Sequence, residues 1–222
     1  MTLSKRLLCV ASFVPEGSFI ADVGSDHAQI PLFLLQNHRI RGAEAIENKK
    51  GPFKRMSSAV LSSPYKENIV LSLSDGISIL DHRVDAVVLA GMGGRLIQKI
   101  LQEHPENLRQ VKSLIIDAHS ERDVLFAFLG EKGFRISQES FFYDEGIPYD
   151  VIQAIQEENP VVYSWKECHF GPLNLKQKSP DFIAYWSKEL ERMSSLIAAG
   201  KLSGKNESVY QQEVSAIKEV LQ

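Results

Sequence analysis

The sequence predicts an α/β fold with a mostly parallel sheet. Short apolar runs typical of buried strands, at 19–23, 41–47, 69–73, 84–90 and 113–118, mostly alternate with segments whose apolar residues recur at helical spacing. Two further runs, 134–143 and 149–156, are joined by the short segment DEGIP, which favours a hairpin and an antiparallel last strand. Open α/β sheets bind ligands at the carboxyl ends of their strands, so the residues that follow each run are the candidate site residues.

Composition narrows the class of protein. The 222 residues, 44% hydrophobic and 24% charged, suit a single core with a small appendage, and no run approaches the length of a membrane span. Cys9 and Cys168 stand far apart in unrelated contexts, which indicates reduced thiols, neither a disulfide nor a metal site, and a cytoplasmic protein. The net charge of -3 argues mildly against nucleic-acid binding, although local basic groups such as Lys49 and Lys50 permit it.

The stretch FIADVGSDHAQIP, residues 19–31, reads as a strand, a nucleotide-binding turn and the start of a helix. Gly24 supplies the tight turn, but Asp26 occupies the position where a dinucleotide fingerprint needs a second glycine close to the pyrophosphate. A carboxylate there repels a diphosphate and suits S-adenosylmethionine, which carries an ammonium and a sulfonium. The alternative is that Gly24 is only a turn glycine and that Asp26 caps the next helix.

Acidic residues at the next two strand ends extend this donor site. Glu47 ends the second strand, where nucleotide-binding sheets place the acceptor for the ribose hydroxyls. Asp75 and Gly76 follow the third strand, and Asp75 is placed to accept from an adenine amino group. A surface glutamate and an ordinary turn aspartate are the alternatives.

The fourth and fifth strands end in candidates for the target side. Ala90 leads into the glycines of GMGG, among them Gly91 and Gly93, which let a substrate and a cofactor approach the backbone. Asp117 and His119 mark the end of the fifth strand, two residues apart and hence on the same face. A single histidine without partners at metal-ligand spacing is more often structural, and no metal site is expected.

The pattern of the sequence changes after residue 160. The C-terminal part predicts two helices, 180–199 and 208–221, joined by the glycine-containing segment 200–206. Each helix carries one apolar seam at spacings of three and four residues, which predicts that the two seams pack together. The predicted division is a nucleotide-binding domain over 1–162 and a linker with a helical hairpin over 163–222.

Four motifs together resemble the bacterial tRNA (adenine-22-N1)-methyltransferases: DVGSDHA at 22–28, Glu47 ahead of a Gly-Pro pair, AGMGGRLI at 90–97, and FGP at 170–172 before the helical hairpin. The resemblance implies a Rossmann-like class I methyltransferase sheet with a C-terminal coiled-coil hairpin. It also implies S-adenosylmethionine as donor and N1 of adenine 22 in tRNA as target, in a chain expected to be a monomer.

The resemblance implies a role for individual residues. Gly24 and His27 would line the methionine end of the donor, Glu47 would hold the ribose, and Asp22 would order the turn. The backbone at Ala90, Gly91 and Gly93 would flank the donor and the target adenine.

The chain departs from the family pattern at several positions. Gln29 replaces a tyrosine, two lysines stand at 49 and 50, Asp75 replaces an asparagine, and Asp117-Ala118-His119 replaces Gln-Pro-Asn. Asp75 can accept as an asparagine does, and Asp117 can accept from the adenine amino group as a glutamine oxygen does.

Two other functions remain open at this stage. A nucleotide-binding protein of the same fold without catalysis is one, with the altered 117–119 strip marking a lost target pocket. An NAD-dependent oxidoreductase is the other, and Asp26 counts against it. The sequence leaves undetermined which tRNAs are used, which residue orients the adenine and whether the hairpin contacts tRNA.

Overall fold

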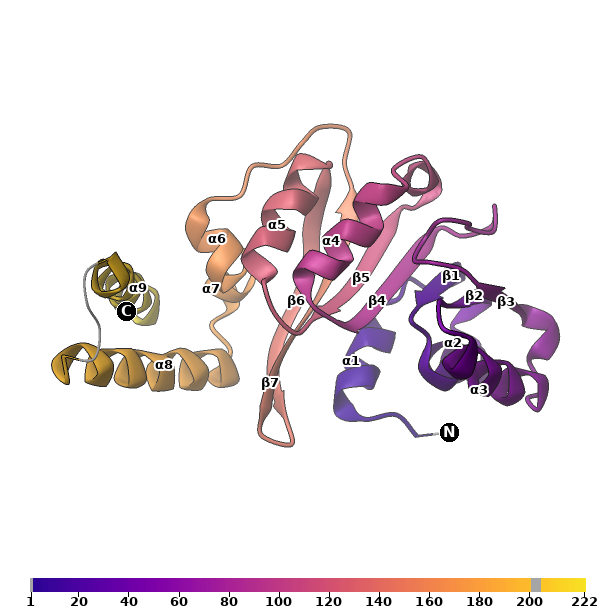
Figure 1. The fold of residues 1–222 in the computed structure, drawn as a ribbon, viewed down its shortest axis with the longest axis horizontal. Helices are drawn as coiled ribbons and strands as arrows, with labels where there is room; N and C mark the ends of the chain where they lie inside the picture. Colours follow the sequence, from indigo (N-terminus) through magenta and orange to yellow (C-terminus); the bar gives the residue numbers. More distant parts are fainter. Residues whose placement is uncertain (1, 201–204) are drawn as a thin grey trace.

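The computed structural model describes residues 2–200 and 205–222 and contains a seven-stranded sheet with helices on both faces (Figure 1). The strand order is β3-β2-β1-β4-β5-β7-β6, in which β7 is antiparallel to both of its neighbours and the other pairs are parallel. The strands are β1 (Ser18–Val23), β2 (Ile40–Glu47), β3 (Ile69–Leu73), β4 (Ala86–Met92), β5 (Ser113–Ala118), β6 (Phe134–Asp144) and β7 (Ile147–Gln156). The predicted fold class is confirmed.

Successive side chains of a strand point to opposite faces of the sheet, and this determines which helices each residue packs against. On β1, Phe19, Ala21 and Val23 face the core on the α4 and α5 side, while Ile20 faces the core under α1, α2 and α3. The helices of the sheet domain are α1 (Lys5–Phe13), α2 (Gln29–Gln36), α3 (Lys50–Leu61), α4 (Gly94–Glu103) and α5 (Arg122–Glu131), with short 3-10 turns η1 (Asp26–Ala28), η2 (Lys66–Asn68) and η3 (Asn107–Gln110). Within the described residues no helix is long and apolar enough to cross a membrane.

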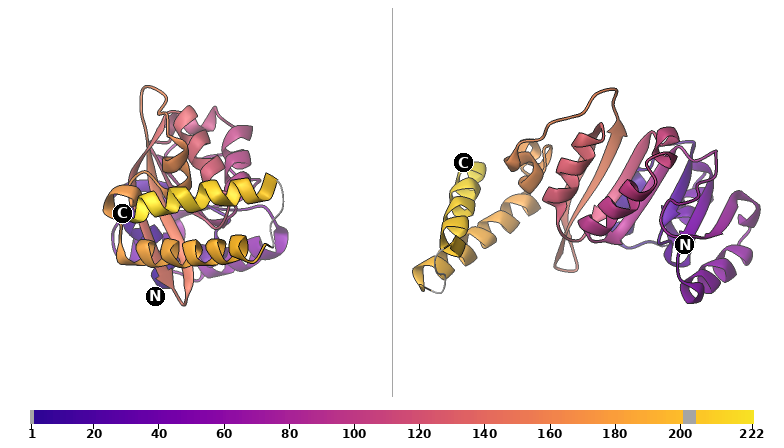
Figure 2. Two further views of the ribbon diagram at one scale, coloured as in Figure 1. Left: turned by 90° about the vertical axis from the view of Figure 1, so that its left-hand side faces the viewer. Right: turned by 45° about the horizontal axis from the view of Figure 1, so that its top comes forward.

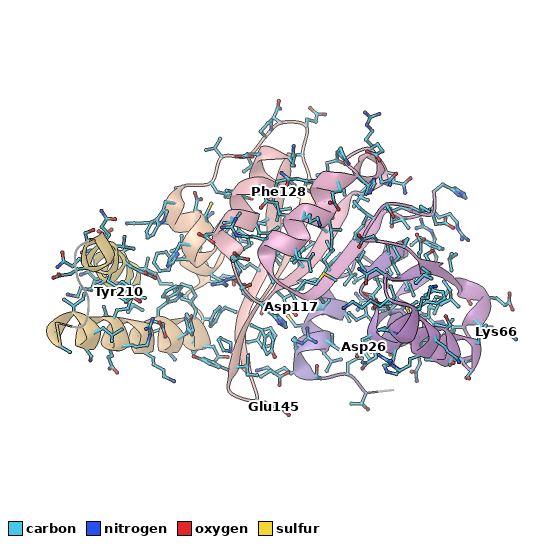
Figure 3. All side chains as sticks on the ribbon, in the orientation of Figure 1. Asp26, Lys66, Asp117, Phe128, Glu145 and Tyr210 are labelled. Carbon is cyan, nitrogen blue, oxygen red and sulfur yellow. The ribbon has the colours of Figure 1, made fainter. Side chains whose placement is uncertain are left out.

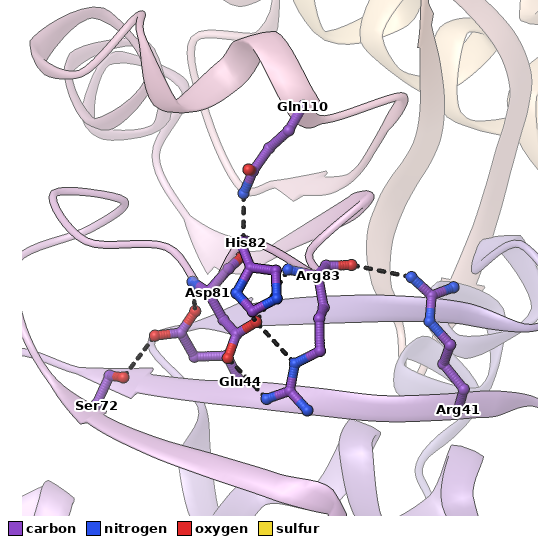
Figure 4. A network of polar contacts seen from close by, with 7 residues as sticks. All are labelled: Arg41, Glu44, Ser72, Asp81, His82, Arg83 and Gln110. Atoms are coloured by element: carbon purple, nitrogen blue, oxygen red, sulfur yellow. Dashed lines mark hydrogen bonds and ion pairs between the residues drawn. The ribbon is translucent and has the colours of Figure 1, made fainter.

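The connection from β3 to β4 is irregular, whereas the other connections between parallel strands contain a helix. A buried carboxylate fixes this irregular segment to the sheet (Figure 4). Glu44 is 1% exposed; its Oε1 accepts from the Ser72 hydroxyl at 2.5 Å and its Oε2 from the backbone N–H of Asp81 at 2.8 Å. Arg83 donates two hydrogen bonds to Asp81 and lowers the pKa of that carboxyl to about 2. These contacts replace the packing that a helix would provide over this part of the sheet.

The C-terminal region begins with α6 (Trp165–Phe170) and α7 (Asn174–Gln177) and ends with the helices α8 (Pro180–Ala198) and α9 (Lys205–Leu221). Residues 163–177 pack on the sheet domain: the Tyr163 hydroxyl accepts from the Ile136 N–H at 2.7 Å, and Cys168 belongs to the core under α5. The division predicted at 162 remains a prediction, and these contacts favour placing 163–177 with the sheet domain.

Helices α8 and α9 extend away from the sheet domain and share a third core (Figure 2). The predicted seams meet in it, with Trp186 and Met193 of α8 opposite Val214 and Ile217 of α9. The same core also contains aromatic residues from β6 and α6, so the apolar seams pack against the sheet domain as well as against each other. A coiled coil remains a prediction. The predicted turn over 200–206 lies largely outside the described residues.

Candidate active site

A cleft of about 340 Å³ opens at the carboxyl ends of β1 to β4, beside the point where the strand order reverses. It combines acidic residues with apolar walls and is lined by Val23, Gly24, Ile46, Glu47, Asn48, Lys49, Pro52, Ser74, Asp75, Gly76, Met92, Leu96 and Ile100. Leu96 of α4 is 50% exposed and forms a wall of the cleft.

Glu47 and Asp75 lie where the sequence predicts them, one after β2 and the other after β3. Oε1 of Glu47 accepts from the backbone N–H groups of Asn48 at 3.0 Å and Lys49 at 2.9 Å, which fixes the carboxylate at the cleft. The Asn48 side chain donates to Asp75 Oδ1 at 3.1 Å and so joins the two acidic positions. No other described group donates to Oε2 of Glu47, which leaves that oxygen for a ligand hydroxyl.

The turn after β1 is tight and strained. Gly24 has φ +72°, a backbone conformation that favours glycine; a Cβ there would lie 2.6 Å from the methyl of Met92, so that flexible side-chain end would also have to shift. His27 and Ala28 follow with φ of 53° and 51°, an uncommon conformation for residues with a side chain. Strain of this kind persists where the surrounding structure holds it and is concentrated at ligand sites.

A smaller cavity of about 80 Å³ lies on the α1 side of the same turn. It is lined by Arg6, Leu7, Asp22, Gly24, Asp26, Gln29, Ile30 and Ala90. Gly24 therefore borders both the cleft and this cavity, while Val23 lines the cleft and Asp22 and Asp26 line the cavity. His27 and Gly93, both predicted site residues, line neither; His27 is half exposed beside Asp26, and Gly93 precedes α4 next to Ser120.

Asp22 is buried at the base of the small cavity and accepts a hydrogen bond from the Ser25 hydroxyl. Burial raises the pKa of the Asp22 carboxyl to about 6, against the smaller opposing effect of Ser25. A cation bound in this cavity would favour the ionised carboxylate and lower that pKa.

Asp117 and His119 lie together at the end of β5, as the sequence predicts, but Asp117 is fully buried and already paired. Its Oδ2 lies 2.5 Å from Arg6 Nη1 and 3.4 Å from His119 Nε2. Its Oδ1 is buried and has no partner among the described residues. Arg6 also lies over the Tyr149 ring, at 5.6 Å from its centroid.

Arg6 is the main residue that sequence reasoning missed. It lies on α1, 111 positions before Asp117, and reaches it because Ile115 and Asp117 share the sheet face that α1 covers. Gly91, with φ +80°, adjoins this group: a Cβ there would lie 3.6 Å from Arg6 Nη1 and 3.9 Å from the His119 ring. No local sequence motif marks Arg6 as a site residue. Its sequence signal is that of a basic residue in the first turn of an amphipathic helix.

The two cavities fit S-adenosylmethionine better than a dinucleotide. Four carboxylates, of Asp22, Asp26, Glu47 and Asp75, border them, against two basic residues: Lys49 in the larger cleft and Arg6 in the smaller cavity, where Arg6 is paired with Asp117. A pyrophosphate would face net repulsion here, whereas a ligand with cationic groups at one end and a ribose at the other matches the charges. Within the described residues, no group of three or more His, Cys, Asp or Glu side chains is placed to hold a metal ion.

Comparison with known proteins also indicates a methyltransferase. The family model for tRNA (adenine(22)-N(1))-methyltransferase matches residues 20–222, which starts after α1 and thus after Arg6. The tRNA (adenine(22)-N(1))-methyltransferase of Bacillus subtilis strain 168 is 30% identical over 201 residues, covering 88% of this chain and 84% of that protein.

Solved structures agree over the whole chain. The crystal structure of Sp1610 from Streptococcus pneumoniae superposes with a TM-score of 0.93 at 35% identity, with all of both chains covered. The same protein in complex with S-adenosyl-L-methionine gives a TM-score of 0.90 at 34% identity, again with full coverage. The chain belongs to the tRNA (adenine(22)-N(1))-methyltransferase family.

Proposed function

We propose that this chain transfers a methyl group from S-adenosylmethionine to N1 of adenine 22 in tRNA. The observation that carries the proposal is the arrangement around Gly24, where an acidic cleft of about 340 Å³ and a cavity with a buried carboxylate meet at one strained turn. Family membership supplies the target base, and it favours methyl transfer over the dehydrogenase alternative.

The residues of the larger cleft hold the donor. Glu47 accepts from a ribose hydroxyl through Oε2, Asp75 accepts from the adenine amino group, and Pro52, Leu96 and Ile100 provide apolar walls for the ring. Asp22, Asp26 and Gly24 border the small cavity, where ionised carboxylates attract the cationic methionine end. Bound there, S-adenosylmethionine supplies an electrophilic methyl group on its sulfonium.

The target side aligns the acceptor. Adenine N1 carries an in-plane lone pair, so the enzyme needs alignment and desolvation more than a general base. Oδ1 of Asp117 has no hydrogen-bond partner but is buried in the free protein, so it accepts from the adenine amino group only after the side chains that cover it move, while Arg6 and His119 hold the carboxylate through Oδ2. The exposed glycine at 91 lets the base approach the backbone.

The reaction also requires access to the target base and binding of the tRNA around it. Adenine N1 is inaccessible in stacked or paired RNA, so the base must be flipped or locally opened to reach this site. The helical hairpin of α8 and α9 supports tRNA binding, and the chain works as a monomer in the cytoplasm. Both cysteines are free thiols, in keeping with that compartment.

The decisive experiment incubates the purified chain with S-adenosylmethionine and an unmodified tRNA transcript and maps the product by reverse transcription, which N1-methyladenine blocks. A stop at position 22 is expected, and it should be absent from a transcript with guanine at that position. Donor and tRNA binding without any methylation would instead support the catalytically silent alternative. Protection against heat by NAD but not by S-adenosylmethionine would reject the proposal outright.

A further inference from the structure

A second large cleft, of about 390 Å³, opens between the sheet domain and the helical hairpin. It lies on the opposite side of Asp117 from Asp26 and the donor turn, toward Tyr210 (Figure 3). Its walls come from α5, α6, α8 and α9, through Arg122, Asp123, His169, Tyr185, Trp186, Glu189, Arg192, Met193, Tyr210 and Glu213. Neither the donor nor the target adenine accounts for this space.

Arg122 connects this cleft to the target side. A small cavity of about 90 Å³ beside His119 and Tyr149 is lined by Arg122 and Tyr185, and both of these residues also line the large cleft. Arg122 is held in place by an ion pair with the buried Asp150, which in turn accepts from the Asn174 side chain at 3.2 Å. A strand of RNA with its target base near His119 can therefore continue past Arg122 into the cleft.

The charges of the cleft select a base over a phosphate. Arg192 lies 2.7 Å from Glu189, and His169 lies 3.2 Å from Glu213 without hydrogen-bond geometry, so the positive groups are already compensated. Asp123 adds a further carboxylate. Phosphate would meet repulsion, whereas the amino and imino groups of a base can donate to these carboxylates.

The remaining walls are aromatic. Tyr185 and Tyr210 line the cleft, one from each helix of the hairpin, while Trp186 is only 4% exposed and belongs to the hairpin core. Single-stranded RNA is recognised largely by such stacking, with hydrogen bonds to the base edges. We propose that this cleft binds an unstacked nucleobase of the tRNA that flanks the target adenine. The inference rests on the proposed function and names a subsite for its substrate.

The test measures steady-state methylation of a tRNA transcript by Arg192→Ala and by a matched control, Arg135→Ala. The two arginines are 50% and 48% exposed, and each is paired with one glutamate, but Arg135 lies on β6 with Glu157, outside the cleft. Arg192 is paired with Glu189 and hydrogen-bonded to Tyr210, so its removal frees two groups that are proposed to contact the base. Arg192→Ala is therefore expected to raise KM for tRNA about five- to tenfold with donor affinity unchanged, the scale of one base contact. Arg135→Ala should match the parent.

A second pair of variants separates stacking from a structural effect. Tyr210→Phe keeps the ring and removes only the hydroxyl that is hydrogen-bonded to Arg192, so it should raise KM for tRNA less than Tyr210→Leu does. Tyr210→Leu, which removes the ring and keeps an apolar side chain, should raise KM by a factor similar to that of Arg192→Ala. Equal KM values for Arg192→Ala, Tyr210→Leu and the parent would overturn the inference.

Salt dependence distinguishes the base from the backbone. Loss of a base contact leaves the slope of log affinity against log salt unchanged, whereas loss of a phosphate contact reduces it by about one. A reduced slope for Arg192→Ala would overturn base binding in the cleft. A parent enzyme that methylates no tRNA would instead overturn the proposed function, and the inference with it.

Discussion

The proposed donor side and the proposed target side of the active site are built in different ways. On the donor side, Glu47 and Asp75 end adjacent strands, are linked through the neighbouring Asn48, and keep acceptor oxygens available to a ligand. On the target side, Asp117 is fully buried and depends on Arg6 from a distant helix. The donor half is therefore a set of local turns at strand ends, and the target half is a tertiary ion-pair group that has to be assembled.

The comparison predicts that the target side is the more fragile. Asp117→Asn keeps the shape but removes the charge opposite Arg6, so we expect turnover on tRNA to fall by roughly 100-fold, the scale of about 3 kcal/mol for breaking a buried charged pair. Donor affinity should stay within about twofold. Single-turnover kinetics and calorimetry measure the two effects.

The matched control for this change is Asp85→Asn, which breaks the ion pair with Arg41 at the opposite end of the strands. It should leave turnover unchanged. Equal turnover of Asp117→Asn and the parent would show that the 117–119 strip is structural and that base recognition lies elsewhere.

The donor side should respond in binding alone. Glu47→Ala removes a charged acceptor, so we expect donor affinity to weaken by about 1.5 to 3 kcal/mol while the thermal stability of the free protein hardly changes. Isothermal calorimetry with S-adenosylmethionine measures this loss. An unaltered dissociation constant would make Glu47 a surface residue and remove the contrast between the two sides.

Removal of the helical hairpin should affect the binding of tRNA and of the donor differently. A chain ending at Lys178 keeps α6 and α7 on the sheet domain and removes α8 and α9. We expect tRNA affinity to fall about tenfold or more while donor affinity is retained. Filter binding and calorimetry provide the two numbers, and tRNA binding as tight as that of the full chain would assign the hairpin another role.

The pKa of Asp22, about 6, predicts a pH dependence confined to the donor. Protonation below that value removes the charge that attracts the cationic methionine end, so donor affinity should fall as pH drops from about 7 to 5, by roughly tenfold per unit at most below pH 6. Asp22→Asn should bind weakly with a flatter profile. A parent profile that is flat over this range would separate Asp22 from donor binding.

The same raised pKa has a consequence for the free protein. A carboxyl whose pKa rises from 3.8 to about 6 on folding gives stability that is present below pH 3.8 and is lost as pH rises through 6. Chemical denaturation between pH 4 and 7 should show this contribution in the parent and not in Asp22→Asn. Bound donor should offset the loss at neutral pH.

The smallest expected effect belongs to Asp75→Asn. The amide keeps an oxygen that can accept from Asn48 and from an adenine amino group, so donor affinity should change by less than about twofold. A tenfold loss, measured by the same calorimetry, would mean that the charge of Asp75 matters, and the donor side would then resemble the target side in its dependence on charge.

The sequence by itself determined the sheet, and it predicted the residues that border the proposed donor site. Apolar runs and helical spacing act over a few residues, and the glycine turn, Glu47 and Asp75 are recognisable because each lies next to the strand that positions it. Only the tertiary structure decided that Arg6 pairs with Asp117, that Leu96 lines the cleft, and that Arg122 lines two cavities. These contacts join segments separated by many residues, and they depend on which face of the sheet each helix covers, which strand alternation alone leaves open.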